Sequence, residues 1–224
     1  MESPDGIDRM HTPPILLIFD FDNTLIDSRI NFPALRGAVI DLLASAGPLP
    51  APREVLMRKP IRDLVEQATV TSPDLASKAW AIIETYEAEG LQGATAMPHA
   101  RAVLDALASG TKRLALLTNN AKAATARVLD HLGLASTIQL VVTRDDVPTI
   151  KPDPAGVRLI LERMGPVRIA YLIGDSWIDG QAAEQAGIRF VGFGTRRAEV
   201  EARGVRPWAW VTDLRELLNL DWDA

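Results

Sequence analysis

The feature that most constrains the fold of this chain is a short apolar run followed by two aspartates. The run, ILLIF at residues 15–19, follows Pro13 and Pro14. Five apolar residues without polar alternation predict a short strand that is buried on both faces, as strands of parallel sheets are. Asp20 and Asp22 follow at its carboxyl end, which is where open α/β sheets bind their ligands. The run therefore predicts both a fold class and the place of a site.

The two aspartates need a chemical reason. Carboxylates in an apolar setting are costly unless a metal, another cation or a shared proton neutralises them, and Mg²⁺ fits oxygen ligands of this kind. A calcium loop is excluded, because Leu25 and Asn31 stand where that motif has Gly and Glu. The remaining alternative is that Asp20 and Asp22 only cap the turn that follows them.

The composition excludes several classes of protein. Of the 224 residues, 47% are hydrophobic, which suffices for one large domain or for a core with a smaller insert. The formal net charge of −5 gives no general attraction to nucleic acid or to anionic membranes. Without cysteine there is no disulfide, thiolate metal site or cysteine nucleophile. The sequence shows no basic leader and no long apolar stretch, so we expect a cytoplasmic protein.

Residues 29–96 are predicted to be helical throughout. Apolar residues recur at helical spacing over 31–46 and again over 53–68, where Pro60 predicts a bend between two short helices. Ser72 then provides a capping signal for a helix that continues to about residue 89.

From Met97 onward, predicted strands and helices alternate. We expect strands over 113–118, 139–143, 169–173 and 189–193, and helices over 98–109, 121–132, 154–164 and 178–186. Such alternation predicts a mostly parallel sheet with helices on both faces. The tryptophan-rich end predicts an edge strand over 208–211 and a leucine-rich helix after it, with the tryptophans in core packing.

Polar residues follow the predicted strands where each strand ends. They are Thr118, Asn119 and Asn120, then Arg144, Asp145, Asp146 and Lys151, and then Asp175 and Asp179. Because the carboxyl ends of parallel strands meet at one edge, we expect these side chains to converge on Asp20 and Asp22. Each has an ordinary alternative, since Thr118 and Asp175 can cap helices and Lys151 can be a solvated loop residue. Their occurrence together at one edge favours a functional site over these alternatives.

Phosphoryl transfer through a covalent aspartyl phosphate suits this set of residues. A phosphate monoester repels an anionic nucleophile, so its site needs a divalent metal, a lysine and neutral hydrogen-bond donors. We predict that Asp20 attacks phosphorus, and that Asp22 protonates the leaving alcohol and then activates water. Asp20 must be ionised on the metal, whereas Asp22 must hold a proton near neutral pH.

Four motifs, DFDNTLIDS, LLTNN, KPDP and GDSWID, resemble those of the haloacid dehalogenase (HAD) superfamily, in its phosphoglycolate phosphatase and β-phosphoglucomutase-like branch. The resemblance covers nearly the whole chain. It implies a Rossmann-like α/β core of residues 1–28 and 97–224, with an α-helical cap domain at 29–96. It also implies a Mg²⁺-dependent phosphatase that acts on a small phosphorylated metabolite of the phosphoglycolate or sugar phosphate type.

The resemblance further implies a role for each motif residue. Asp20 matches the nucleophile and Asp22 the acid/base, which also binds Mg²⁺ through its backbone carbonyl. The other matches are Thr118, Asn119 and Lys151 for phosphate binding, and Asp20, Asp22, Asp175 and Asp179 for the metal. Family members commonly have Gly in place of Asn23, and Ser or Gly in place of Asn120. The presence of Asp22 favours phosphate ester chemistry over the dehalogenases, which lack this second acid.

Substrate selection is predicted to come from the cap. Arg58, Lys59 and Arg62 form a dense basic stretch around Pro60, and a cap loop at about this position reaches the substrate in the family. These residues predict a leaving group with a second anionic or polyhydroxyl portion. The alternative is that the three cations only keep the cap soluble.

Two other functions stay open. The same core residues would serve a mutase that returns the phosphoryl group to a second hydroxyl of a sugar, and phosphate release against isomerisation of a hexose 1-phosphate separates the two. A non-catalytic binding or regulatory module is the second. We expect no nucleic-acid or membrane partner, and a monomer or homodimer.

Overall fold

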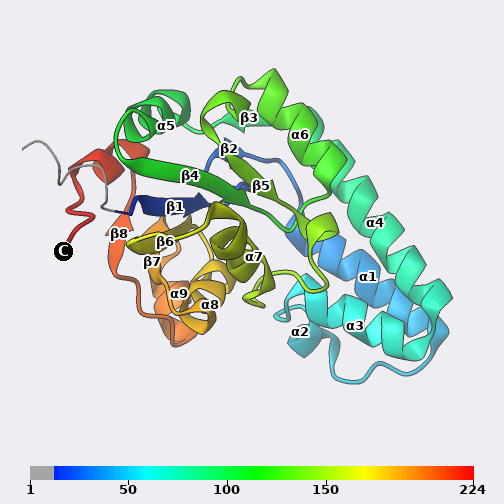
Figure 1. The fold of residues 1–224 in the computed structure, drawn as a ribbon. Coiled ribbons are helices and arrows are strands. Elements are labelled where there is room, and N and C mark those ends of the chain that lie inside the picture. Colours follow the sequence, from blue (N-terminus) through cyan, green and yellow to red (C-terminus); the bar gives the residue numbers. More distant parts are fainter. Residues whose placement is uncertain (1–12) are drawn as a thin grey trace, which may run out of the picture.

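Six parallel strands form the central sheet of the computed structural model, which describes residues 13–224 (Figure 1). Their order across the sheet is β5-β4-β1-β6-β7-β8. The bounds are β1 Ile15–Phe19, β4 Lys112–Leu117, β5 Leu140–Val142, β6 Ile169–Gly174, β7 Arg189–Phe193 and β8 Ala209–Val211. β1 pairs in parallel with both β4 and β6, so the residue after it, Asp20, lies near the middle of the carboxyl edge. The predicted α/β class is confirmed.

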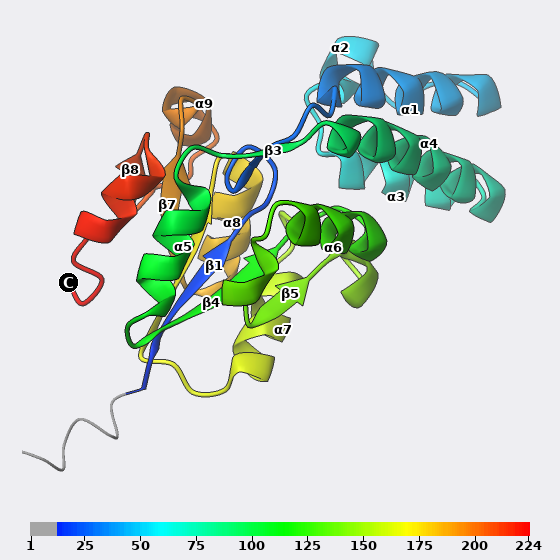
Figure 2. The ribbon, with the colours of Figure 1, turned by 90° about the horizontal axis from the view of Figure 1, so that it is seen from above.

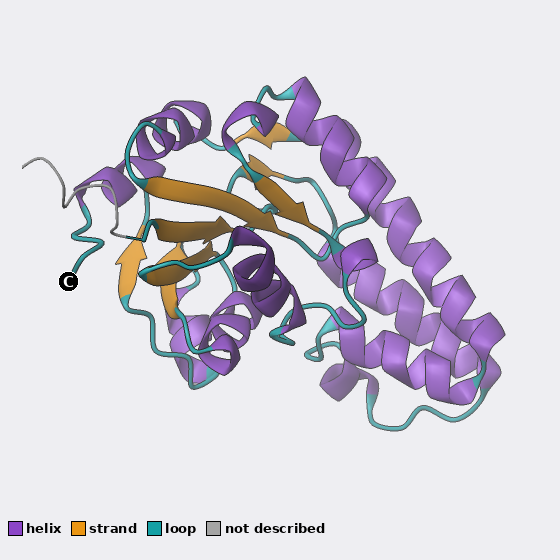
Figure 3. Cartoon of the chain, viewed as in Figure 1, coloured by secondary structure: helices purple, strands orange, loops and turns teal. Residues whose placement is uncertain are grey.

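Helices cover both faces of this sheet (Figure 3). Helices α5 Ala100–Ala108 and α6 Lys122–His131 contribute to one apolar cluster, and α7 Ala155–Met164 and α8 Trp177–Ala186 contribute to the other. The side chains of β1 alternate between the two clusters: Ile15, Leu17 and Phe19 join the first, and Leu16 and Ile18 join the second. This explains why β1 has no polar position. The predicted ends of these elements agree with the structure to within two residues.

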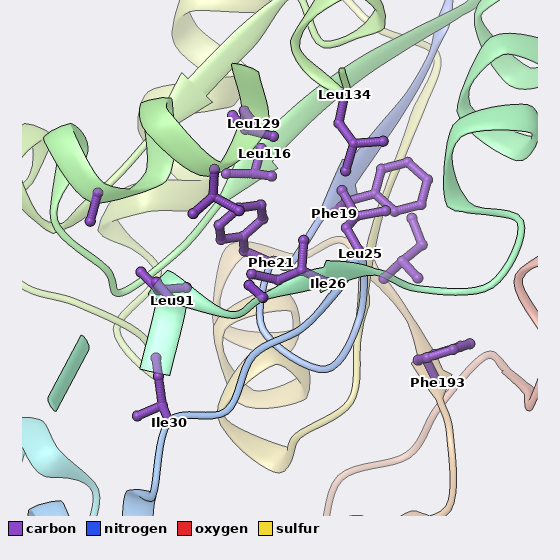
Figure 4. Close-up of a cluster of buried hydrophobic side chains, with 14 of the residues drawn as sticks. Phe19, Phe21, Leu25, Ile26, Ile30, Leu91, Leu116, Leu129, Leu134 and Phe193 are labelled. Atoms are coloured by element: carbon purple, nitrogen blue, oxygen red, sulfur yellow. The ribbon is translucent and has the colours of Figure 1, made fainter. Parts of the chain in front are cut away.

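The loop after β1 is anchored from within the core (Figure 4). Phe21, between the two aspartates, is fully buried, and so are Leu25 and Ile26. These side chains pack in the same apolar cluster as Leu116 and Leu129. Their burial fixes the loop, so that the aspartates on either side of Phe21 are held at the edge of the sheet.

Four helices lie between the short strands β2 and β3, to one side of the sheet (Figure 2). They are α1 Phe32–Ala46, α2 Arg53–Leu56, α3 Ile61–Thr71 and α4 Pro73–Gln92. Asn31 Oδ1 accepts from the Ala34 amide at 3.0 Å and begins α1, and Ser72 Oγ accepts from the Leu75 amide at 3.1 Å and begins α4. The predicted bend at Pro60 separates α2 from α3. We propose that these helices form the cap; residues 1–12 of the expected core lie outside the described residues.

The structure departs from the expected elements, or refines them, at three places. Residues 29–96 are not all helical, because β3 Thr95–Ala96 pairs with β2 Ile26–Asp27, and two-residue strands are too short to show an alternating pattern. Helix α9 Arg197–Ala202 was not predicted, since only Val200 on it is buried. The segment Leu214–Asn219 is a 3₁₀ helix rather than an α-helix, because its buried leucines are three residues apart.

The tryptophan-rich end packs into the core, as expected. Trp222 is buried, and the ring centroids of Trp208 and Trp222 lie 4.9 and 4.8 Å from that of Tyr171. None of the helices within residues 13–224 is both long and apolar enough to cross a membrane.

The chain enters the helical segment by crossing the end of α4. The Arg29 amide donates to the Gly90 carbonyl oxygen at 3.1 Å. A Cβ atom on Gly90 would lie 2.6 Å from both the backbone nitrogen and the Cα atom of Ile30. A glycine is therefore required where the two segments cross.

Replacing Gly90 with alanine is expected to destabilise the protein. Because the clash involves Ile30 backbone, rotation of a side chain cannot relieve it, and we expect a loss of about 1–3 kcal/mol in the free energy of unfolding. Urea denaturation measures this loss. Gly93→Ala is the matched control, since its Cβ would meet only the Arg29 side chain at 3.8 Å. Equal stability of the two variants would contradict the crossing contact.

Candidate active site

Asp20 lies at the carboxyl end of β1, where its amide donates to the Ile173 carbonyl oxygen at 2.8 Å and so ties it to β6. Its side chain has two partners. Oδ1 is 2.5 Å from Lys151 Nζ, and Oδ2 accepts from the Thr24 hydroxyl at 3.2 Å. Asp20 is only 6% exposed, so the positive charge of Lys151 neutralises a carboxylate with little access to water.

Lys151 is the cation of the site. Its buried Nζ donates to Asp20 Oδ1 at 2.5 Å, to Asp179 Oδ1 at 2.6 Å and to the Leu117 carbonyl oxygen at 3.0 Å. Three acceptors match the three protons of an ammonium group. Burial opposes the charge, but the carboxylates of Asp179 and Asp20 raise the pKa of Lys151 above its ordinary value.

Asn119 holds the backbone of Lys151 with two hydrogen bonds. Its Nδ2 donates to the Lys151 carbonyl oxygen at 3.1 Å, and its Oδ1 accepts from the Lys151 amide at 3.0 Å. These contacts position the lysine, which adds a structural task to the phosphate-binding role expected for Asn119. Thr118, the other expected phosphate ligand, is buried, and its hydroxyl accepts from the Asn120 amide at 3.1 Å.

Asp22 has a different environment from Asp20. Its Oδ2 accepts from Asn120 Nδ2 at 2.7 Å, while its buried Oδ1 has no hydrogen-bond partner within residues 13–224. Burial, followed by the nearby Asp20 carboxylate, raises the pKa of Asp22 to about 7. Asp22 can therefore gain and lose a proton near neutral pH, as its predicted role requires.

The departures from the family pattern at Asn23 and Asn120 have local explanations. Asn23 has φ +58°, and asparagine is one of the few residues other than glycine that adopts this left-handed conformation readily. Asn120 supplies the amide that contacts Asp22. The sequence alone identified both positions but not these contacts.

Asp175 and Asp179 lie at the start of α8. Ser176 caps this helix, and its amide donates to Asp179 Oδ2 at 3.2 Å. A Cβ atom on Gly174 would lie 2.5 Å from Asp179 Cγ, so only glycine at the end of β6 admits the Asp179 carboxylate. Burial and the Asp20 carboxylate raise the pKa values of both Asp175 and Asp179.

The acidic residues fit a divalent cation. Asp20, Asp175 and Asp179 are buried, and each offers a carboxylate oxygen within 4.8 Å of the others. Burial, and then the nearby Asp20 carboxylate, raise the pKa values of Asp175 and Asp179, and a bound cation would favour their charged forms. A set made only of oxygen donors is the type that Mg²⁺ prefers.

A cavity of about 320 Å³ joins these residues to the helical segment. Asp20, Asp22, Asn119, Lys151, Asp175 and Asp179 line it together with residues of α1, α3 and α4. Arg58 and Arg62 also line it, whereas Lys59 does not and faces Asp63 at 3.7 Å. The structure thus brings together the predicted core residues except Thr118, which does not line the cavity, and it separates Lys59 from the two arginines.

Comparison with known proteins agrees with this geometry. The family model described as "Haloacid dehalogenase-like hydrolase" matches residues 17–193. A phosphoglycolate phosphatase of Pseudomonas putida is 31% identical, with 92% of this chain and 79% of the relative covered. A hydrolase from Pseudomonas syringae has a similar structure, with a TM-score of 0.69, 25% identity, and coverage of 91% of this chain and 95% of the other. A putative haloacid dehalogenase-like hydrolase from Bacteroides fragilis has a TM-score of 0.69 at 20% identity, with coverage of 90% and 98%.

A buried ion pair that the sequence did not reveal joins α4 to the site. Arg144 Nη1 donates to Glu87 Oε1, and the side chains are only 5% and 7% exposed. The Arg144 guanidinium also lies 5.0 Å from the centre of the Trp80 ring, and the Ala121 amide donates to Glu87 Oε2 at 3.4 Å. Glu87 therefore connects the helical segment directly to the loop after β4.

Replacing Arg144 with methionine is expected to leave Glu87 as a buried carboxylate without its cation. Breaking such a pair costs about 3–5 kcal/mol of unfolding free energy, measurable by urea denaturation. The double variant with Glu87→Met should recover most of this loss, because no unpaired charge remains. Glu89→Met, on the exposed side of the same helix, is the control and should change stability little. A double variant as unstable as Arg144→Met would contradict the pairing.

Proposed function

We propose that this chain, which belongs to the haloacid dehalogenase-like hydrolases, is a Mg²⁺-dependent phosphatase that hydrolyses a small phosphorylated metabolite through an aspartyl phosphate. The family match, taken with the phosphoglycolate phosphatase relative at 31% identity, identifies it as a phosphoric monoester hydrolase. The substrate that we propose is of the phosphoglycolate or sugar phosphate type, a choice supported by the phosphoglycolate phosphatase of Pseudomonas putida at 31% identity.

One observation carries the proposal: two aspartates on the same loop have opposite environments. Asp20 faces the Lys151 ammonium at 2.5 Å, whereas Asp22 is buried beside a neutral amide and has a pKa raised to about 7. An anionic carboxylate next to one that can carry a proton is the pair that nucleophilic attack and leaving-group protonation require.

In the first half of the reaction, a carboxylate oxygen of Asp20 attacks phosphorus and the bond from phosphorus to the ester oxygen breaks. The proton of Asp22 passes to that oxygen, so the leaving group departs as a neutral alcohol. Lys151 stabilises the negative charge of the phosphoryl group, and Asn119 keeps the lysine in place through its backbone.

In the second half, Asp22 is a carboxylate and takes a proton from a water molecule. The water oxygen attacks phosphorus, and the bond from phosphorus to Asp20 breaks. Inorganic phosphate leaves, and both aspartates return to their starting states. Asp20, Asp175 and Asp179 would hold Mg²⁺, which when bound supplies positive charge to the phosphoryl oxygens.

Asp20→Asn is expected to abolish phosphatase activity, since an amide does not attack phosphorus. The measurement is release of inorganic phosphate from p-nitrophenyl phosphate and from a panel of sugar phosphates and phosphoglycolate. We expect kcat to fall by a factor of about 10³ or more. Asp27→Asn, on the exposed side of β2, is the control and should keep its activity. Retention of a tenth of the wild-type kcat by folded Asp20→Asn protein would show that Asp20 is not the nucleophile.

Removal of divalent metal is expected to abolish activity, and Mg²⁺ should restore it. Ca²⁺ should restore it poorly, because it is larger and less strict in its coordination geometry. Phosphate release in EDTA, and after addition of each metal, tests this. Trp177, which lines the cavity two residues after Asp175, gives a second readout through its fluorescence during Mg²⁺ titration. Full activity in EDTA would refute the metal requirement.

A further inference from the structure

Five arginines line the cavity, and apart from Arg62, which is paired with Glu66 at 3.2 Å, they lie close together beside the acidic site. The other four come from both parts of the chain: Arg36 from α1, Arg58 from the loop between α2 and α3, Arg196 from the residue before α9, and Arg203 from its end. We call these four the arginine cluster. In a chain with a net charge of −5, such a concentration of positive charge in one wall is a specific feature of this cavity.

Most of these positive charges lack an acidic partner. Arg196 Nη1 lies 3.2 Å from Asp175 Oδ2, which places the cluster next to the acidic site. For Arg36, Arg58 and Arg203, residues 13–224 provide no carboxylate within ion-pairing distance. Glu199 also lines the cavity and offsets part of the charge. Burial, followed by the charges of Arg196 and Arg203, lowers the pKa of Arg36, and an anion in this wall would favour its charged form.

The cluster is held in place by backbone contacts. Arg36 Nε donates to the Lys59 carbonyl oxygen at 3.1 Å, and Arg203 Nη2 donates to the Arg58 carbonyl oxygen at 3.2 Å. The Arg203 guanidinium also lies 4.6 Å from the centre of the Trp177 ring. These contacts fix part of each guanidinium and leave its other N–H groups for a ligand.

Part of the remaining wall is apolar. Phe32, Leu35, Met57 and Ile61 from the helical segment line the cavity, together with Trp177 from α8. A volume of about 320 Å³ corresponds to about ten water molecules, which leaves room for an organic leaving group beside the phosphoryl group. The cavity therefore combines the acidic, metal-binding residues with an apolar part of its wall and with the arginine cluster, which adjoins the acidic residues at Arg196.

We propose that the arginine cluster binds a second anionic group, a carboxylate or a phosphate, carried by the leaving group of the phosphate ester. The apolar wall and the Trp177 ring then cover the carbon chain between the two anionic ends. This inference rests on the proposed phosphatase function and adds the class of substrate. Because two of the arginines belong to the helical segment and two to the sheet-bearing part, such a substrate contacts both.

Calorimetric titration of the Mg²⁺-loaded protein with non-hydrolysable phosphonates tests the proposal. Propylphosphonate has an uncharged tail, 2-carboxyethylphosphonate has a carboxylate on a chain of the same length, and ethane-1,2-bisphosphonate has a second phosphonate. We expect at least one of the two doubly anionic ligands to bind about tenfold or more tightly than propylphosphonate. The better of the two identifies the second group as carboxylate-like or phosphate-like.

Arg58→Gln is the decisive variant, and Lys59→Gln is its matched control. Both remove one exposed positive charge from the same loop, but only Arg58 lines the cavity. Arg58→Gln should reduce the tenfold preference to about twofold, whereas Lys59→Gln should leave it unchanged. Arg203→Gln, with exposed Arg206→Gln as its control, repeats the comparison on the other side of the cavity.

Equal affinities of all three ligands for the wild-type protein, or the same preference in Arg58→Gln and Lys59→Gln, would overturn the anion subsite. The failure of the proposed function is a separate result. A protein that hydrolyses p-nitrophenyl phosphate but binds the ligands equally refutes the subsite alone. A protein that hydrolyses no ester refutes the phosphatase, while the binding comparison still decides whether the arginines take an anion.

Discussion

The site depends on one buried ammonium group. Asp20 directly follows β1 and Asp179 lies in α8, and their carboxylates could not approach each other in a buried position without a cation between them. Lys151 Nζ lies within 2.6 Å of both, and its third proton goes to the Leu117 carbonyl oxygen at the end of β4. A single side chain thus joins three segments at the edge of the sheet. The same contact therefore holds together the carboxylates that can bind a metal and the cation that can bind a phosphate.

The parallel sheet makes this contact possible, and its main features follow from the sequence. Buried strands without polar positions, separated by amphipathic helices, admit few arrangements, and all of them bring the carboxyl ends to one edge. For this reason Asp20, Lys151 and Asp175 could be assigned to one site before any coordinates were known. The same reasoning failed for β2 and β3, because strands of two residues have no periodicity and are defined only by the partner that the fold brings to them.

The sequence did not predict contacts between residues that are far apart along the chain. Nothing in the neighbourhood of Glu87 distinguishes it from Glu84 or Glu89 on the same helix, yet it alone of the three is buried. Its partner Arg144 looked like one more polar residue at the end of a strand. Burial of both, and the Trp80 ring beside them, results from the packing of α4 against the loops of the sheet. A sequence pattern predicts which face of a helix is buried, but not which residues pack against that face.

The sequence-based prediction and the structure differ most at the residues expected to select the substrate. The basic stretch around Pro60 was interpreted as one unit, but Arg58 and Lys59 face different surroundings, and Arg62 is engaged by Glu66 at 3.2 Å. The arginines that complete the cavity wall, Arg196 and Arg203, are more than 130 residues away in sequence and belong to the sheet-bearing part. A substrate held by both sides gains its contacts only when the two parts face each other, so recognition of the leaving group and exclusion of water become one event. In the proposed binding mode, the discrimination between phosphate esters is therefore a property of the junction between the two parts rather than of either alone.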